Sequence, residues 1–179
     1  ISFVYVCNAH CTNCTYNNSE IRKSYKDAIF MSEEMFKKIA DECGEYNAII
    51  RISGGGEPML HPQAVELIKY AKQKGAKIGL ITNGSLFTYE LLAELIENQI
   101  DAIEFSVDAC DEETYKKVRP GLDWQRTLHN VKNAIKIRNE EKSSTRIIVS
   151  AINQIGVDIK SVEKFWEPIA DKVQIRKYL

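Results

Sequence analysis

The feature that most constrains the fold of this chain is a regular alternation between short apolar runs and longer amphipathic stretches. Six apolar runs have the length and β-branched content of strands, at residues 1–6, 48–52, 77–81, 102–106, 146–152 and 173–178. The stretches between them carry helix-start signals, with Pro62 opening one helix and capping residues at Ser32, Thr88, Asp111 and Asp158. Right-handed crossovers then produce a parallel sheet. We predict an α/β fold, an open six-unit (β/α)6 partial barrel, with a doubly wound sheet as the alternative.

Length and charge set the outer limits of the interpretation. The 179 residues predict one domain over residues 1–179, and a hydrophobic content of 44% is enough for a sizeable core. The net charge of -1 gives no global field that would recruit nucleic acid or an anionic membrane. There is no run of about 18 apolar residues and no signal-peptide pattern, so we expect a cytoplasmic protein. Because the chain opens inside a strand-like run without an initiator Met, we expect it to be a domain of a longer protein.

Polar or glycine-rich groups follow each of the first five predicted strands. They lie at residues 7–14, 53–58, 82–85, 106–108 and 150–154, whereas the segments that lead into the strands show no such enrichment. In parallel α/β folds, functional side chains gather at the carboxyl ends of the strands. We therefore predict that this rim of the sheet is the functional site.

Three cysteines, Cys7, Cys11 and Cys14, stand in the stretch "CNAHCTNC" directly after the first apolar run. Their spacing would fit one helix face, but the Asn, His and Thr residues between them favour a loop. A loop with three thiols in a reducing compartment suits a metal. One interpretation is a zinc site completed by His10. The other is a 4Fe-4S cluster, in which three cysteines leave one iron open to a small molecule.

The pattern C-x3-C-x2-C after a first strand, followed by "GGGEP" after the second, resembles the radical S-adenosylmethionine (radical SAM) superfamily. The resemblance covers nearly the whole chain, as a six-unit partial barrel. It implies that the three cysteines hold a 4Fe-4S cluster whose fourth iron is chelated by S-adenosyl-L-methionine. It also implies that Gly55, Gly56 and Glu57, extended by Gly54, form the motif that meets the substrate's amino group. Pro58 closes this turn.

Further cofactor-binding residues follow from the same resemblance. It places Asn83 of "TNG" on the cofactor side, Ser106 and Asp108 facing S-adenosylmethionine, Arg119 near the rim as a carboxylate partner, and Ser150 and Asn153 against the methionyl or ribose part. The plain alternatives are an ordinary Asn-Gly turn at Asn83 and a surface helix stop at Arg119. One departure from the family pattern is Asn13, which replaces the aromatic residue that often contacts adenine.

The function implied by the resemblance is reductive cleavage of S-adenosylmethionine to a 5'-deoxyadenosyl radical that abstracts hydrogen from a substrate. "SVDACDEETYKKVRPG" resembles peptide-modifying and molybdopterin-synthesis members, so we expect a peptide as the possible substrate and a flavodoxin- or ferredoxin-like external electron donor. Two alternatives stay open. The first is an activase of glycyl-radical enzymes, and the second is a non-catalytic zinc or iron-sulfur binding module.

Overall fold

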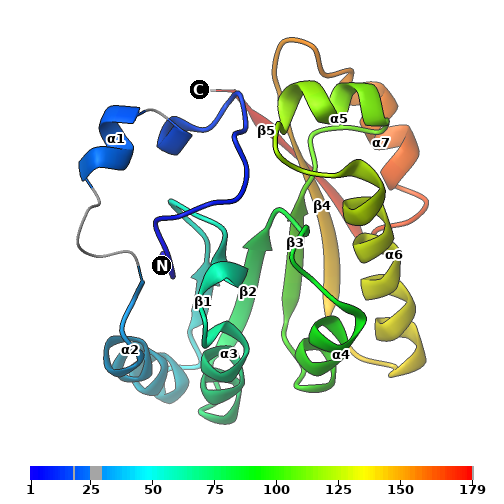
Figure 1. Ribbon diagram of the computed structural model, residues 1–179. Helices are drawn as coiled ribbons and strands as arrows, with labels where there is room; N and C mark the ends of the chain where they lie inside the picture. The colour runs from blue at the N-terminus through cyan, green and yellow to red at the C-terminus, as the bar shows by residue number, and fades with distance from the viewer. Residues whose placement is uncertain (18, 25–29, 179) are drawn as a thin grey trace.

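The computed structural model describes residues 1–17, 19–24 and 30–178. Its centre is a parallel sheet whose five strands lie in chain order: β1 (Ile49–Ile52), β2 (Lys77–Thr82), β3 (Ala102–Ser106), β4 (Arg146–Asn153) and β5 (Lys172–Lys177). Parallel neighbours need a crossover after every strand, and helices supply it (Figure 1). The α/β class is confirmed. The doubly wound alternative is wrong, because its strand order reverses along the sheet whereas this order runs in sequence.

The predicted helices form where their capping residues stand. After a short α1 (Ser19–Ser24), the helices are α2 (Glu33–Glu45), α3 (Ala64–Gln73), α4 (Tyr89–Glu97), α5 (Glu112–Val118), α6 (Trp124–Glu140) and α7 (Ile159–Trp166). Ser32, Thr88, Asp111 and Asp158 each accept a hydrogen bond from a backbone N–H in the first turn of the helix that follows. Within the described residues, no helix combines the length and apolar character needed to span a bilayer.

The first apolar run does not form a strand of this sheet, which corrects the expectation for residues 1–6. Its backbone contacts include an isolated antiparallel bridge from Val4 to Phe30 and hydrogen bonds between Ile1 and the end of β1. Phe3 and Val4 are each 1% exposed, so the run is apolar because it packs into the core. Burial and strand formation give the same signal in a short apolar run, and here burial alone explains it.

The two faces of the sheet differ in composition. Along β1 and β2, alternate residues are buried and exposed, as expected for strands with one face against helices. The side chains on the helix-covered face are nearly all inaccessible, including Ile52, Ile78, Leu80, Ile103, Phe105, Ile147 and Val149. The opposite face carries polar residues such as Arg51 and Glu104. The hydrophobic core therefore lies between the sheet and its helices.

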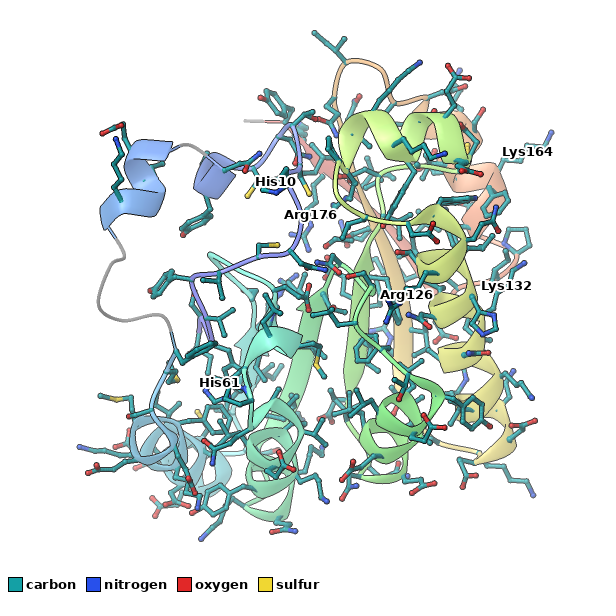
Figure 2. The ribbon with its side chains drawn as sticks, viewed as in Figure 1. His10, His61, Arg126, Lys132, Lys164 and Arg176 are labelled. Carbon is teal, nitrogen blue, oxygen red and sulfur yellow. The ribbon has the colours of Figure 1, made fainter. Side chains whose placement is uncertain are left out.

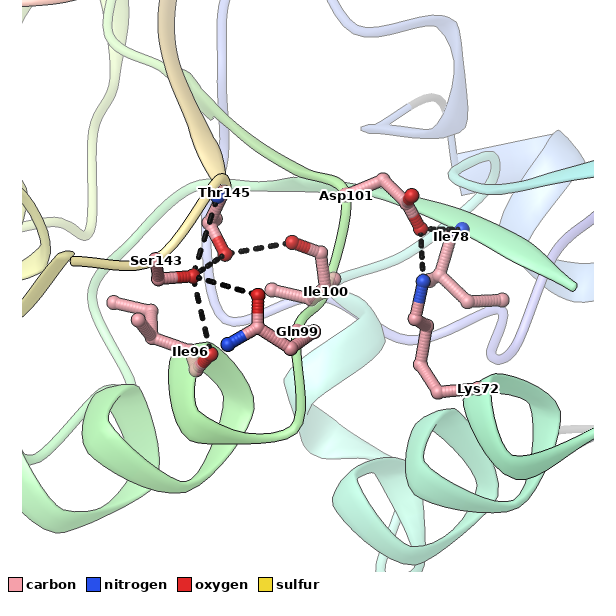
Figure 3. Close-up of polar contacts among 8 residues, drawn as sticks. All are labelled: Lys72, Ile78, Ile96, Gln99, Ile100, Asp101, Ser143 and Thr145. Carbon is pink, nitrogen blue, oxygen red and sulfur yellow. Dashed lines mark hydrogen bonds and ion pairs between the residues drawn. The ribbon is translucent and has the colours of Figure 1, made fainter. Parts of the chain in front are cut away.

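Polar side chains at the amino ends of the strands hold the returning loops in place (Figure 3). Asp101 Oδ2 accepts from the Ile78 backbone N–H at 2.7 Å and from Lys72 Nζ at 2.6 Å. Thr145 donates its hydroxyl to the Ile100 carbonyl at 2.7 Å, and Ser143 Oγ lies 2.9 Å from the same hydroxyl. These bonds satisfy buried backbone groups where the strands begin, so this end of the sheet is structural.

Replacement of Thr145 by Val tests this structural role. Valine keeps the shape but leaves the buried Ile100 carbonyl without its donor, so we expect a loss of about 1–3 kcal/mol in the free energy of unfolding. The measurement is urea denaturation. The matched control is Thr114→Val, whose hydroxyl bonds to the exposed Asp111 carboxylate, and it should change stability by less than about 0.5 kcal/mol. Equal losses in both variants would contradict the assignment.

Candidate functional site

A cleft of about 330 Å³ lies at the carboxyl ends of the strands. The cysteine loop, the glycine turn after β1, and the ends of β2, β3 and β4 all contribute to its walls. Of the residues predicted for the site, the cleft is lined by Cys11, Cys14, Gly54, Gly56, Glu57, Asn83, Ser106 and Arg119. Segments that are distant in sequence thus meet at one rim, where the pattern of strand exits predicted a site.

The remaining predicted residues lie outside the walls of the cleft. Gly55 is buried, Asp108 and Ser150 are 1% and 4% exposed, and Asn153 is exposed at the end of β4. Cys7 is half-buried, with its sulfur 4.0 Å from Asn83 Nδ2. Asp108 and Cys7 therefore lie behind the wall of the cleft, in contact with Arg119 and Asn83, which line it.

The cysteine segment is a loop, as its composition predicted. Its backbone is attached to the end of α5: the His10 N–H donates to the Pro120 carbonyl at 2.8 Å, and the Thr12 N–H donates to the Val118 carbonyl at 3.1 Å. The "RPG" stretch after α5 therefore positions the cysteines. Sequence reasoning missed this pairing, because the two segments are more than 100 residues apart in the chain.

The three thiols are free, and their surroundings differ. Burial raises the pKa of Cys7 and of Cys11, and Cys14 is exposed. Each of the buried thiols has a neighbouring donor: the Ala9 N–H lies 3.4 Å from Cys7 Sγ, and Arg119 Nη1 lies 3.6 Å from Cys11 Sγ. Such donors would stabilise the thiolate that forms when a metal binds the sulfur and the thiol proton is released to solvent.

The three thiols are the candidate metal ligands of the cysteine loop. Among residues 1–17, 19–24 and 30–178, no three His, Cys, Asp or Glu side chains are grouped to hold one metal ion. A zinc site needs four donors around one centre, whereas a 4Fe-4S cluster takes one thiolate per iron and so needs separated thiols. His10, labelled in Figure 2, is exposed, and its Nδ1 lies 3.2 Å from Asn17 Oδ1. Three cysteine thiols match the pattern of one thiolate per iron with one iron left open.

The glycine turn lies tightly against the N-terminal segment. A Cβ at Gly56 would lie 2.2 Å from the Val6 carbonyl oxygen, and a Cβ at Gly55 would lie 2.6 Å from the Tyr5 ring. Gly54 has a φ of 114°, a conformation that side chains rarely adopt. The glycines therefore pack against the N-terminal segment, through the Val6 main chain and the Tyr5 side chain, and this contact fixes the segment that leads into Cys7.

Glu57 is a buried hub of this rim. It is 2% exposed, and its carboxylate accepts from Thr82 Oγ1 at 2.6 Å, from the Asn83 N–H at 2.7 Å and from the Met59 N–H at 3.2 Å. Burial raises the pKa of Glu57, and these three hydrogen bonds oppose that rise. The carboxylate thus joins the turn after β1 to the end of β2. Thr82 lies in the predicted strand-exit segment 82–85 but was not singled out as a site residue.

A second buried carboxylate, Asp108, pairs with Arg119. Asp108 Oδ2 accepts from Arg119 Nη2 at 2.7 Å and from Nε at 3.1 Å, while Oδ1 accepts from the Ile152 N–H at 2.7 Å. Arg119 does end α5, but its side chain is 8% exposed, so it is not a surface helix stop. The Asn13 side chain donates to Asp108 at 3.4 Å, which gives this departure from the family pattern a structural role.

Asn83 belongs to a network that also includes Asn8 and Ser85. Its Nδ2 donates to Asn8 Oδ1 at 2.9 Å, and its Oδ1 accepts from Ser85 Oγ at 2.7 Å. Asn8 and Ser85 were not predicted as site residues. Beside β4, Gln154 has a buried amide nitrogen with no partner within the described residues, and it too was not predicted. A sequence signal existed for both Asn8 and Ser85, since each adjoins a predicted residue.

The sequence profile described as the radical SAM superfamily matches residues 1–164. The chain is 30% identical over 140 residues to the tungsten-containing aldehyde ferredoxin oxidoreductase cofactor-modifying protein of Pyrococcus furiosus, covering 75% of this chain and 37% of that protein. It is 26% identical over 181 residues to a GTP 3',8-cyclase of Microcystis aeruginosa, covering 93% of this chain and 53% of the relative. The chain thus spans only about one-third to one-half of the length of these relatives.

Solved structures share the fold at low sequence identity. Streptococcus suis SuiB bound to precursor peptide SuiA superimposes with a TM-score of 0.80 at 16% identity, covering 99% of this chain and 38% of SuiB. Methylornithine synthase (PylB) superimposes with a TM-score of 0.71 at 19% identity, covering 100% of this chain and 52% of that chain. At these identities the likeness concerns the fold, which is a partial (β/α) barrel.

The thiol environments predict an order of chemical reactivity in the metal-free protein. A raised pKa lowers the thiolate fraction at neutral pH, so iodoacetamide should modify the exposed Cys14 several-fold faster than Cys7 or Cys11. Peptide mass spectrometry after timed quenching measures the three rates. Cys11 reacting as fast as Cys14 would show that burial does not shield the thiol of Cys11.

A substitution at Gly56 tests how tightly the N-terminal segment is held. Gly56→Ala forces the added methyl against the Val6 backbone, so we expect a loss of about 1–3 kcal/mol in the free energy of unfolding. The matched control is Gly79→Ala in β2, where nothing lies within 4 Å of the added Cβ. Urea denaturation compares the two variants. An unchanged stability in Gly56→Ala would contradict the close contact.

Proposed function

Because this chain belongs to the radical SAM superfamily, we propose that it is a radical SAM enzyme that holds a 4Fe-4S cluster on Cys7, Cys11 and Cys14. S-adenosylmethionine binds in the cleft beside them. In the proposed reaction, one electron from the reduced cluster breaks a carbon–sulfur bond of the sulfonium, which yields methionine and a 5'-deoxyadenosyl radical that takes a hydrogen atom from the substrate.

The observation that carries this proposal is the shared cleft. Cys11 and Cys14 line it together with Gly54, Gly56 and Arg119, which come from different parts of the chain. A cysteine loop that served only as a structural metal site would need no adjoining hollow. A hollow that opens directly onto the thiols supports a metal with an exchangeable position for a ligand.

The residues around the cleft have distinct proposed tasks. Gly54 and Gly56 present main chain without side chains, so an ammonium group of the ligand can approach their carbonyl oxygens. Arg119 has five N–H groups, of which Asp108 and Cys11 engage three. The remaining donors are available to a carboxylate of the ligand. Glu57, Thr82 and Asn83 hold the floor of the cleft in place.

A peptide is the substrate class that we propose first. The support is the fold shared with SuiB, whose structure contains a precursor peptide, and the "SVDA…RPG" stretch noted above. The electron for the cleavage comes from an external donor of flavodoxin or ferredoxin type, and a cytoplasmic location supplies the reducing conditions that the free thiols need. The chain spans only about one-third to one-half of the length of its relatives, so the substrate and the donor are proposed and not assigned to particular residues.

The test is anaerobic reconstitution of the protein with iron and sulfide, followed by reduction, addition of S-adenosylmethionine and chromatography. We expect 5'-deoxyadenosine from the wild type and at least a hundredfold less from Cys7→Ala, because one iron loses its ligand. Cys43→Ala is the matched control, since Cys43 lies on α2 among core residues, and it should retain both the cluster and the product. Zinc bound without iron, or full turnover by Cys7→Ala, would overturn the proposal.

A further inference from the structure

A second and larger cavity, of about 550 Å³, lies on the face of the sheet that the helices leave uncovered. Residues of the strands form its walls, with side chains on this uncovered face. The charged residues of the walls are Arg51, Glu104, Arg146, Lys172 and Arg176. We call this space the basic cavity. With four cations and one carboxylate it has a net charge of +3, although the whole chain has a net charge of -1. Positive charge is thus concentrated at this place.

The arginines of the two edge strands converge on one carboxylate of the central strand. Arg51 of β1 donates Nη2 to Glu104 Oε2 at 2.8 Å, and Arg176 of β5, labelled in Figure 2, donates Nη2 to Glu104 Oε1. Glu104 is 6% exposed, so the triad is fixed at the base of the cavity. One carboxylate neutralises only one of two guanidinium groups, and each guanidinium has further N–H donors for a ligand.

The other two cations have no such counterion. Within the described residues, no ion pair is recorded for Arg146 or Lys172. The nearby Asp171 is paired with Arg138 at 2.6 Å. Apolar residues such as Ile81, Ala102 and Ile148 complete the lining. Cationic groups above an apolar floor suit an organic anion rather than a free inorganic ion.

The basic cavity adjoins the cofactor cleft on the same face of the sheet. Ile81 lines both spaces. On β3, Glu104 lines the cavity and Ser106 lines the cleft, so the two spaces are about 7 Å apart along the strand. A molecule held by its charged end in the basic cavity therefore extends towards the cleft.

We propose that the basic cavity binds the anionic group of the substrate, a carboxylate or a phosphate on an organic molecule, and so directs the rest of that molecule to the cofactor cleft. Its assignment to the substrate rests on the proposed function, because only that function makes the cleft a reaction centre. The substrate is then a peptide with an acidic side chain in the segment that enters the cavity. The charge complementarity selects it before any chemistry occurs.

The test is isothermal titration calorimetry of the protein as isolated, at fixed ionic strength, with three probes. Phenyl phosphate and phthalate are dianions that carry phosphate and carboxylate, and benzyl alcohol is a neutral molecule of similar size. We expect saturable binding of at least one dianion and none of benzyl alcohol. The stronger of the two dianions identifies which anionic group the cavity prefers.

The decisive comparison uses two double variants, each of which removes one Arg and one Lys. Arg146→Ala with Lys172→Ala should weaken dianion binding roughly tenfold. Arg126→Ala with Lys164→Ala removes one Arg and one Lys from the outer helices α6 and α7 (Figure 2). This control should leave the affinity for the dianions unchanged. Thermal melts followed by circular dichroism show that both variants fold.

Three results would contradict the proposed anion site. No binding of either dianion, equal weakening in both double variants, or a dimer in sedimentation that excludes the dianions would overturn the proposal. The last result would mean that a second copy covers this face. The readout needs no cleavage of S-adenosylmethionine, so its failure leaves the proposed function standing. Loss of the cleavage activity, in turn, leaves the anion site standing.

Discussion

The contact between the glycine turn and the N-terminal segment is the constraint on which the rest of the site depends. The Glu57 N–H donates to the Val6 carbonyl at 2.9 Å, and Gly56 leaves no room for a side chain between the two backbones. This contact sets where the chain enters the cysteine loop. The Glu57 side chain continues the same connection to Thr82 and Asn83. One turn therefore fixes the cysteine loop and the exits of β1 and β2 relative to one another, and the cleft lies where they meet.

The two ends of the sheet use buried polar groups for different purposes. At the amino ends, the hydroxyl of Thr145 and the carboxylate of Asp101 satisfy backbone groups that the loops would otherwise leave unpaired. At the carboxyl ends, Glu57 and Asp108 are buried carboxylates, and an ionised group is costly to bury even with good partners. An apolar core would be more stable there. The retention of these carboxylates beside the thiols is consistent with a rim shaped by function at the expense of stability.

Local signals allowed much of the fold to be predicted, and non-local contacts explain what was missed. Five strands and the capped helices follow from periodicity and caps, which act within a few residues. The first apolar run was misassigned, because core burial and strand formation share one pattern. Glycine and cysteine motifs located the site, but the pairing of Arg119 with Asp108 and the convergence of Arg51 on Glu104 arise only when distant segments meet. No spacing rule in the sequence encodes those contacts.

The cleft and the basic cavity differ in charge, and this difference suggests separate roles in substrate binding. In the cleft, Arg119 is paired with Asp108, and Glu57 adds a buried carboxylate, so the cleft has no surplus of positive charge. The basic cavity keeps a surplus of positive charge. Binding energy for an anionic group would then be gained away from the reacting atoms, and it would serve to hold the substrate in one orientation. A reactive radical needs that separation, because a substrate that moves freely exposes more than one carbon–hydrogen bond to attack. Charge in the cavity would therefore determine which bond reaches the cleft.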